Sequence, residues 1–388
     1  MIGRLSVSIG GRAAAAGLQI FVVALIARAL GVSDFGVFVA TSSVVLVLMT
    51  FSELGMGARL LTGLSTVPSR RNLTTFTIVR VLLLVAVSVG SVFVAASLHL
   101  DAGLIVAASI YAAGDATGDL ATAILQGAKR SGYAMLLLCG RRLLVLGLLW
   151  CIPGEEGAVI AITVGGAAGA LVFGVLACRN LARPRRLREL IAENLRIILS
   201  GGASSAAQLD VAMVSAGAGS VAAGLYGSAS RLFNPINLVV STMVQVFVPE
   251  VAGQAGQPSR LRAFRRVRIV VLLFAVAVAA ASVMGPWIVV VLYGPQYQGA
   301  APIAVAVFLA AAFSAIGQAY MAWYYATEIP KLVPVLMWAA SIIGIAAILL
   351  LASLFGVVGA AGGLVLMHLL ALGAIVIPWK RSLEADDG

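Results

Sequence analysis

Apolar stretches of about twenty residues or more recur along the whole of this 388-residue chain, with little other sequence between them. A helix rises about 1.5 Å per residue, so about twenty apolar residues cross the roughly 30 Å hydrocarbon core of a bilayer. The sequence predicts twelve spans, at 7–30, 36–61, 73–99, 104–127, 131–152, 156–178, 195–217, 223–250, 267–293, 300–326, 331–354 and 356–379. The predicted fold is therefore an all-α polytopic membrane protein.

Composition excludes the common soluble classes of protein. Apolar residues make up 61% of the chain and charged residues 11%, against about 45–50% and about 25% in soluble globular proteins. A soluble enzyme, a disordered chain and a disulfide-rich secreted module are therefore excluded. The three cysteines, Cys139, Cys151 and Cys178, have no metal-ligand spacing, so we expect neither a metal nor a cofactor.

The distribution of Arg and Lys predicts the orientation in the membrane. The net charge is +11, which in a soluble protein would suggest nucleic acid. Here the loop cations alternate from side to side, and Arg28 is the only one in the loops of the less basic side. Cytoplasmic loops carry the excess of Arg and Lys. We therefore expect a multi-pass protein of the inner (plasma) membrane with both termini cytoplasmic and no nucleic-acid partner.

The longest predicted cytoplasmic connection divides the chain into halves. It contains the run Arg183-Pro-Arg-Arg-Leu-Arg188, which is typical of a basic amphipathic helix lying on the inner leaflet. The predicted organisation is an N-terminal six-helix lobe (1–180), a basic cytoplasmic linker (181–194) and a C-terminal six-helix lobe (195–388), with a cavity between the lobes. Two six-helix bundles facing each other form a transporter architecture.

A weak internal repeat supports this division. Gly31 and Gly36 follow the first span, and Gly219 and Gly224 follow the seventh with the same spacing, each set continuing into an apolar-aromatic pair. A shift of six spans preserves orientation, so the repeat would be parallel. Chance matching in a chain with 42 glycines is the alternative.

Helix breakers mark places where motion or close packing is expected. Pro235 interrupts the eighth span, and Gly201-Gly202 interrupts the seventh. Either a bendable helix or close packing through small residues would explain these positions. For the glycines at 165–169 in the sixth span, close packing is favoured.

Two segments resemble a known family. The first runs Arg28-Ala-Leu-Gly31-Val-Ser-Asp-Phe35-Gly36, and the second runs Gly224-Leu-Tyr-Gly-Ser-Ala-Ser-Arg231-Leu232. Both resemble the polysaccharide (O-antigen-type) flippases of the multidrug/oligosaccharidyl-lipid/polysaccharide (MOP) exporter superfamily. The twelve predicted spans and paired lobes extend the resemblance over nearly the whole chain. The lipid II flippase branch usually has fourteen spans, and two further spans are not found here.

The resemblance implies a function and partners. It implies flipping of an undecaprenyl-pyrophosphate-linked oligosaccharide to the outer leaflet, as in lipopolysaccharide or other polysaccharide biosynthesis. Further expected partners are bilayer lipids, an H⁺ or Na⁺ coupling ion bound by deep carboxylates, and polysaccharide polymerase or export components.

Ionisable residues deep in the predicted spans are the main candidates for function, because burying charge in a bilayer is costly. Arg141 and Arg142 lie near the midplane of the fifth span, at the depth of Asp115 in the fourth. Asp119 lies one turn from Asp115 on the same face. Two alternatives explain these charges. They form structural ion pairs with no role in binding a substrate, or the arginines line a cavity that binds a pyrophosphate. The three expected pairs are Glu53–Arg80, Asp115–Arg141 (or Arg142) and Asp210–Arg231.

The candidates divide into two groups. The expected substrate-binding residues are Arg141, Arg142, Arg12, Arg28, Arg59, Arg231 and Arg80, of which Arg28, Arg59 and Arg231 rest mainly on the family motif. The expected ion-coupling residues are Asp115, Asp119, Asp210 and Glu53.

Two other functions remain open at this stage. A multidrug or cation antiporter of the same superfamily would favour an acidic, aromatic cavity. An intramembrane prenyl- or phospho-transferase would use the Asp115-x3-Asp119 spacing to hold Mg²⁺ and pyrophosphate. Such an enzyme needs a second acidic cluster, and Glu189-x3-Glu193 lies in the basic linker instead. No P-loop pattern is present, so the chain is expected to be a transporter rather than an enzyme.

Overall fold

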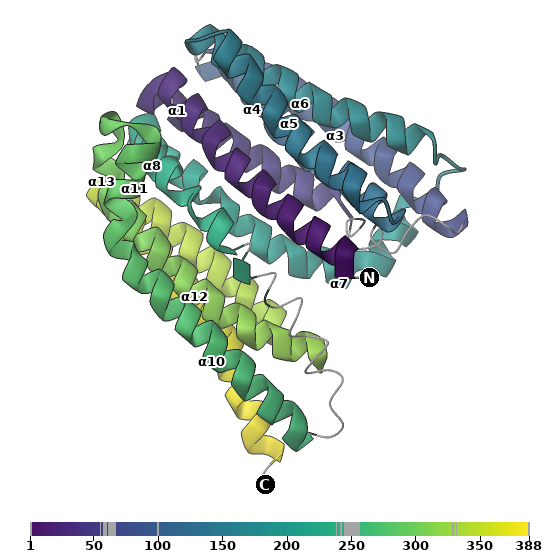
Figure 1. Ribbon diagram of the computed structural model, residues 1–388, viewed down its shortest axis with the longest axis vertical. Helices are drawn as coiled ribbons and strands as arrows, with labels where there is room; N and C mark the ends of the chain where they lie inside the picture. Colours follow the sequence, from purple (N-terminus) through teal and green to yellow (C-terminus); the bar gives the residue numbers. More distant parts are fainter. Residues whose placement is uncertain are drawn as a thin grey trace. The chain divides into compact units, whose positions relative to one another are not determined.

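The computed structural model divides the chain into two compact units, Met1–Ala212 and Met213–Gly388. It describes residues 2–54, 56, 60, 67–98, 101–237, 239–240, 243, 257–327, 330 and 332–386. All regular structure in these ranges is helical (Figure 1). The lobe and linker boundaries expected from the sequence stay a prediction.

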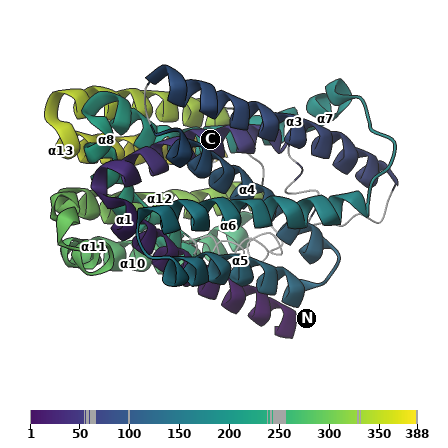
Figure 2. The same ribbon diagram turned by 90° about the horizontal axis from the view of Figure 1, so that it is seen from above.

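The first unit consists of antiparallel helices. In chain order they are α1 (Ile2–Ser52), α3 (Val67–Leu98), α4 (Ala102–Gly127), α5 (Ser131–Cys151), α6 (Glu155–Cys178), α7 (Leu187–Ala206) and the 3₁₀ turn η1 (Ala207–Leu209). Helix α4 packs against α1, α5 and α6 and so lies at the centre of this unit (Figure 1 and Figure 2). Asp101 caps α4 by accepting a 2.7 Å hydrogen bond from the Gly103 amide.

The second unit continues the same architecture. Helix α8 (Asp210–Ser230) begins at the end of the first unit and runs into the second. The following elements are α10 (Gln257–Ala281), η2 (Ser282–Met284), α11 (Gly285–Tyr293), η3 (Pro295–Ala300), α12 (Ala301–Ala326) and α13 (Leu332–Asp386).

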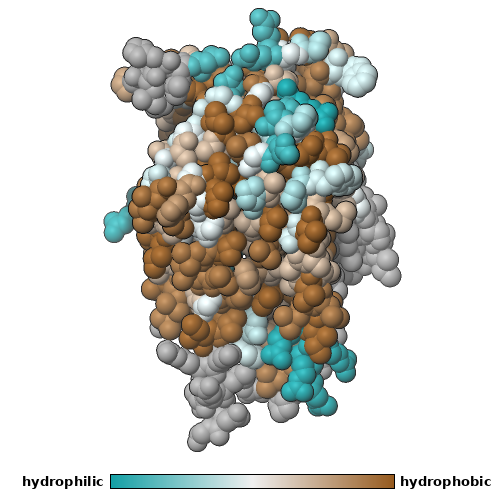
Figure 3. All heavy atoms as spheres, turned by 90° about the vertical axis from the view of Figure 1, so that its left-hand side faces the viewer, coloured by the Kyte–Doolittle hydropathy of each residue, from teal (hydrophilic) through white to brown (hydrophobic). Residues whose placement is uncertain are grey.

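The outer surface of the helices is apolar, as a bilayer requires. Eight helical stretches in the described residues are long and apolar enough to cross a membrane. On α3 one exposed row consists of Val81, Leu82, Val85, Val89 and Phe93. Figure 3 shows a face whose middle is filled by hydrophobic atoms (brown), with hydrophilic atoms (teal) toward its upper and lower edges. Exposing such an apolar surface to water is unfavourable, whereas exposing it to lipid is not.

Helix α1 contains two of the predicted spans, because the chain reverses at Gly31. Gln19 and Phe38 lie on opposite sides of this glycine, yet the Gln19 amide reaches the Tyr111 hydroxyl at 3.5 Å and the Phe38 ring lies 5.7 Å from the Tyr111 ring. In a straight helix these residues would be about 28 Å apart. Gly31 has φ 77° and ψ 176°, a conformation open essentially to glycine alone.

Helix α13 is divided in the same way at Gly356, where φ is 61°. The backbone of Gly344 approaches Met367, and that of Gly363 approaches Ile348, so the two halves lie antiparallel. Further glycines with positive φ follow α5, divide α8 and follow α11, at Gly154, Gly219 and Gly294 respectively. With the three division points at Gly31, Gly219 and Gly356 counted, the described helices agree with the twelve predicted spans, apart from the ends of 36–61 and 223–250, which lie largely outside the described residues.

Gly219 also supports the internal repeat. Its dihedral angles, φ 85° and ψ 175°, nearly equal those of Gly31. The two positions that the sequence comparison paired therefore make the same backbone break, after the first and the seventh span.

Replacing Gly31 with alanine is expected to destabilise the protein by about 1–3 kcal/mol, because a Cβ strains this backbone conformation. No atom lies within 4 Å of the new methyl group, so strain acts without a clash. Gly90→Ala on α3, which also meets no atom within 4 Å, is the control. Thermal unfolding in detergent should show a lower midpoint for Gly31→Ala alone. Equal midpoints for the two variants would contradict the assigned turn.

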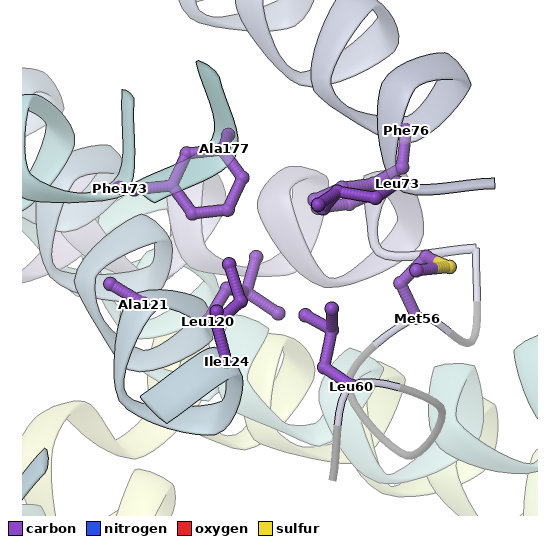
Figure 4. Packing of buried hydrophobic residues seen from close by; sticks show 9 residues of the cluster. All are labelled: Met56, Leu60, Leu73, Phe76, Leu120, Ala121, Ile124, Phe173 and Ala177. Carbon is purple, nitrogen blue, oxygen red and sulfur yellow. The ribbon is translucent and has the colours of Figure 1, made fainter. Parts of the chain in front are cut away.

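The core of the first unit joins α3, α4 and α6. Figure 4 shows Phe76, Leu120 and Phe173 converging, and the rings of Phe76 and Phe173 meet edge to face with centroids 6.0 Å apart. Glycines bring α4 and α6 unusually close: a Cβ on Gly114 would overlap the Gly166 backbone, and one on Gly169 would overlap the Gly114 carbonyl. The expectation of close packing in the sixth span is confirmed.

The breaks in the seventh and eighth spans differ from each other. The interruption predicted at Gly201 and Gly202 is wrong, because α7 is continuous through both glycines and 3₁₀ geometry begins only at η1. Helix α8 ends at Ser230, residues Arg231 and Leu232 form a turn, and the helix resumes with Pro235 in its first turn. The interruption predicted beside Arg231 is therefore present, because proline is accommodated at a helix start but not in its interior.

Candidate functional site

A row of polar side chains runs along one face of α4. Tyr111, Asp115 and Asp119 are each four residues apart, so they lie one above another, and Gln126 continues the row toward the end of the helix. Arg141 and Arg142 of α5 meet the middle of this row. The four charged residues Asp115, Asp119, Arg141 and Arg142 are here called the charge cluster.

Asp115 bridges the two arginines. Its carboxylate lies 2.7 Å from Nη1 of Arg142, and its second oxygen accepts from Nη2 of the same guanidinium at 2.9 Å. It also lies 3.4 Å from Nη1 of Arg141, which donates in addition to the Asp115 backbone carbonyl at 3.0 Å. The ion pairing of Asp115 with these arginines, expected from the sequence, is confirmed.

Asp119 holds the other side of Arg141. Nη2 of Arg141 donates to the Asp119 carboxylate at 2.7 Å. The side chains differ sharply in exposure, at 4% for Arg141 and 9% for Arg142, but 20% for Asp115 and 60% for Asp119. The arginines are thus nearly covered, and Asp119 is the most exposed member of the cluster.

Glycines make room for the charges. Gly118 faces the Arg141 guanidinium so closely that a Cβ would overlap it, and the guanidinium also lies 3.2 Å from the Cβ position of Gly169. The charge cluster has no net charge, and its ions satisfy one another in a region where solvation is poor. The Nε atoms of Arg141 and Arg142 are buried and have no hydrogen-bond partner among the described residues.

Uncharged residues that the sequence analysis missed complete the site. The Tyr111 hydroxyl accepts from Nη1 of Arg142 at 3.3 Å and from Gln19 at 3.5 Å. Arg12 donates to the Gln126 side chain at 3.4 Å, so this predicted residue joins the same row from α1. The four-residue spacing of Tyr111 from Asp115 was the available signal, since it places the hydroxyl on the charged face.

Arg80 lies in a separate, closed environment. It is fully buried, and it donates to the Thr117 hydroxyl at 3.2 Å, to the Ser52 hydroxyl at 2.6 Å and to the Met49 carbonyl. Within the described residues Glu53 forms no direct ion pair with it, although the two interact electrostatically. Arg80 therefore ties α3 to α1 and α4 mainly through neutral oxygens, and its Nη2 has no partner there.

The remaining predicted residues lie elsewhere. Arg28 is exposed on α1, Asp210 is half-buried at the start of α8, and Arg59 lies outside the described residues. The pair Asp210–Arg231 would join the two units and stays a prediction. In the second unit Arg231 occupies the turn after α8, near the buried Tyr293.

Metal-dependent transferase chemistry finds no support in the geometry. No group of three His, Cys, Asp or Glu side chains that could hold a metal ion occurs in the described part of the chain. Asp115 and Asp119 already bind arginines rather than facing a second acidic cluster. The three cysteines are free thiols.

The sequence profile of the polysaccharide biosynthesis protein family matches residues 5–252, well over half of the chain. The chain belongs to this family. The matched segment includes the charge cluster, Arg80 and the turn at Arg231. Among curated protein sequences none matches the chain.

Solved structures show the same fold. A lipid II flippase, MurJ, in an inward closed conformation superposes with a TM-score of 0.73 at 14% identity, covering 94% of this chain and 86% of that chain. An inward-facing multidrug resistance transporter of the MATE family gives 0.63 at 16% identity, covering 99% and 98%. A MOP superfamily transporter from Pyrococcus furiosus gives 0.58 at 17%, covering 98% and 94%.

These findings decide the class of the protein. It is a multi-pass membrane protein with the fold of the MOP superfamily. The solved structures that share this fold are a flippase and transporters. The resemblance to the MOP superfamily, drawn from residues 28–36 and 224–232, is confirmed.

Proposed function

We propose that the protein flips a lipid-linked oligosaccharide, joined to an undecaprenyl carrier through pyrophosphate, from the cytoplasmic to the outer leaflet. Membership of the polysaccharide biosynthesis family supports a substrate of this class. The observation that carries the proposal is the Arg141–Asp119 pair, in which a buried guanidinium ends at an exposed carboxylate. Both termini are proposed to be cytoplasmic, because the basic loops then face the cytoplasm.

The pyrophosphate is proposed to compete with Asp119 for Arg141. The charge cluster is neutral as it stands, so an anion gains a cation only by displacing one carboxylate. Asp115 contacts both arginines, whereas Asp119 contacts Arg141 alone and is far more exposed. Asp119 is therefore the carboxylate that gives way, and Arg141 then offers its donors to phosphate oxygens.

This competition links the substrate to an ion gradient. A proton or Na⁺ that neutralises Asp119 frees Arg141 to bind pyrophosphate, and loss of the ion restores the pair and expels the substrate. Asp119 is thus the proposed coupling residue in an alternating-access cycle. Asp115 is proposed to keep both arginines in place throughout.

The other predicted residues take different roles in this proposal. Arg80, with Glu53 nearby, is assigned to stabilising the junction of α1, α3 and α4, because it is fully buried among neutral acceptors. Arg12 is assigned to the end of the same polar row. Arg28, Arg59, Arg231 and Asp210 stay predictions that rest on the family motif and on depth.

The test is Asp119→Asn in proteoliposomes, with a synthetic polyprenyl-pyrophosphate-linked saccharide as the probe. Binding of the probe should tighten about tenfold or more, since a charge-assisted bond worth about 1.5–3 kcal/mol no longer competes. Flipping should slow, because the substrate is no longer expelled. Asp101→Asn, a neutralisation at the exposed cap of the same helix, should change neither quantity, since asparagine caps equally well.

Two results would overturn the proposal. Unchanged probe affinity in Asp119→Asn would show that Asp119 does not compete with the substrate. Transport of cationic dyes by the wild type, lost in Asp119→Asn and without any flipping of the pyrophosphate probe, would make the protein a multidrug antiporter.

A further inference from the structure

The connection after α6 is fastened to the start of α3, although the two segments are about 110 residues apart in the chain. The Thr75 hydroxyl accepts from the Arg185 amide at 2.7 Å and lies 2.7 Å from the Arg185 carbonyl. The neighbouring Thr74 hydroxyl accepts from the Ala182 amide at 2.9 Å. These bonds make the connection part of the first unit.

The first turns of α7 have three distinct faces. Leu190 and Asn194 are fully buried against the unit. Leu187, Ile191 and Leu195 form an exposed apolar stripe at four-residue spacing. The third face carries acidic residues.

One arginine of the same segment is paired with both glutamates of that acidic face. Arg185 donates to the Glu189 carboxylate at 3.1 Å and also to Glu193. Hydrogen bonds to Glu193 and Glu189 raise the pKa of Arg185, so this arginine stays charged and bound to its own segment. It is not available to a partner.

Other arginines around the stripe are available. Arg183 and Arg186 are exposed on the connection, Arg188 is exposed in the first turn of α7, and Arg71 is exposed on α3, one turn before Thr75. Among the described residues none of these four has a carboxylate partner. Arg186 and Arg188 flank Leu187, the first residue of the stripe, and Arg71 is joined to the same segment through the Thr75–Arg185 contact. Together Arg71, Arg183, Arg186, Arg188 and the stripe of Leu187, Ile191 and Leu195 are called the basic edge.

We propose that the basic edge binds the phosphate headgroups of anionic phospholipids, with its apolar stripe in the outer part of the acyl layer. Helix α7 runs without a break from Leu187 into an apolar span, so the stripe ends within about 12 Å of Leu187 along the axis and remains beside the bilayer. Cations flanking an apolar stripe match an anionic leaflet in charge and in hydrophobicity. Neither a soluble anion nor a polar protein surface would use the leucines.

The binding site would join the two segments that Thr74 and Thr75 already fasten. Anionic lipid would therefore hold the N-terminal end of α7 against α3 during transport. This inference does not depend on the identity of the transported substrate, only on the position of the chain in a membrane.

The test is hydrogen exchange of residues 181–195 in the full-length protein in nanodiscs. Replacing phosphatidylcholine with a mixture containing phosphatidylglycerol should slow exchange at least about fivefold, the factor that one arginine near an anionic surface contributes. The triple variant Arg183→Gln/Arg186→Gln/Arg188→Gln should lose this protection. The triple variant Arg262→Gln/Arg265→Gln/Arg266→Gln removes the same charge from exposed positions of α10 and should keep it.

Three outcomes would overturn the proposal. Equal exchange in the two lipids would show that the headgroup is not recognised. Equal loss in both triple variants would assign the effect to net charge. Protection by inorganic phosphate in phosphatidylcholine nanodiscs would make the site one for soluble anions.

Discussion

Asp115→Asn is expected to cost about 3–5 kcal/mol of stability and to abolish transport. Removing one partner of a buried ion pair leaves an uncompensated charge, and here a single carboxylate serves two arginines. After the substitution Asp119 alone faces two guanidinium groups that are less than a tenth exposed. Thermal unfolding and the yield of monodisperse protein in detergent measure the effect.

A second substitution separates stability from transport. Asp115→Asn/Arg142→Gln removes both members of the bidentate pair, so the remaining charges, Arg141 and Asp119, balance again. Replacing both partners is often nearly neutral, so stability should return to within about 1 kcal/mol of the wild type. A single variant as stable as the wild type, or a double variant no better than the single, would contradict the assigned pairing.

The second large effect is expected at the contact between α4 and α6. In Gly166→Ala the new Cβ would lie 2.7 Å from the Tyr111 Cα atom and would overlap the Ile110 carbonyl. Backbone atoms cannot avoid the clash by changing rotamer, as a side chain can, so the two helices must move apart. Overpacking commonly costs about 1–3 kcal/mol, and a clash with backbone should reach or exceed the upper figure.

Transport should be lost in Gly166→Ala beyond the loss of protein, because displacing Tyr111 disturbs the hydroxyl that contacts Arg142. Gly174→Ala, also on α6 but with no atom within 4 Å of its Cβ position, should behave like the wild type. Unfolding midpoints and flipping per folded molecule are the measurements. Equal behaviour of the two variants would show that the helices are not in close contact at Gly166.

The sequence predicted the spans and the charge cluster because both depend on simple counting. About twenty apolar residues identify a span wherever they occur, and depth along a helix placed Arg141 and Arg142 level with Asp115. The predicted interruption beside Pro235 and the close packing at Gly166 followed from the known behaviour of proline and glycine in helices.

The missing parts depend on contacts between distant segments. Arg80 was expected to pair directly with Glu53, but its bonds go to hydroxyl and carbonyl oxygens, which no charge pattern reveals. The Thr75–Arg185 contact joins residues whose local sequence contains no sign of each other. The different exposure of Asp115 and Asp119 depends on how neighbouring helices cover each side chain, which spacing along α4 does not determine.

The glycine turns have a consequence for whatever meets the protein on its outer side. Gly31, Gly154, Gly219, Gly294 and Gly356 follow odd-numbered spans, so with the proposed cytoplasmic termini they would all face outward. At Gly31, Gly219 and Gly356 helix continues on both sides of the glycine, residues 152–154 link α5 to α6, and Gly294 leads directly into η3. A protease or antibody approaching from that side would find only short connections to bind. Under the proposed function, an enzyme that receives the lipid beside these five glycines would meet only short connections, and would collect its substrate from the membrane.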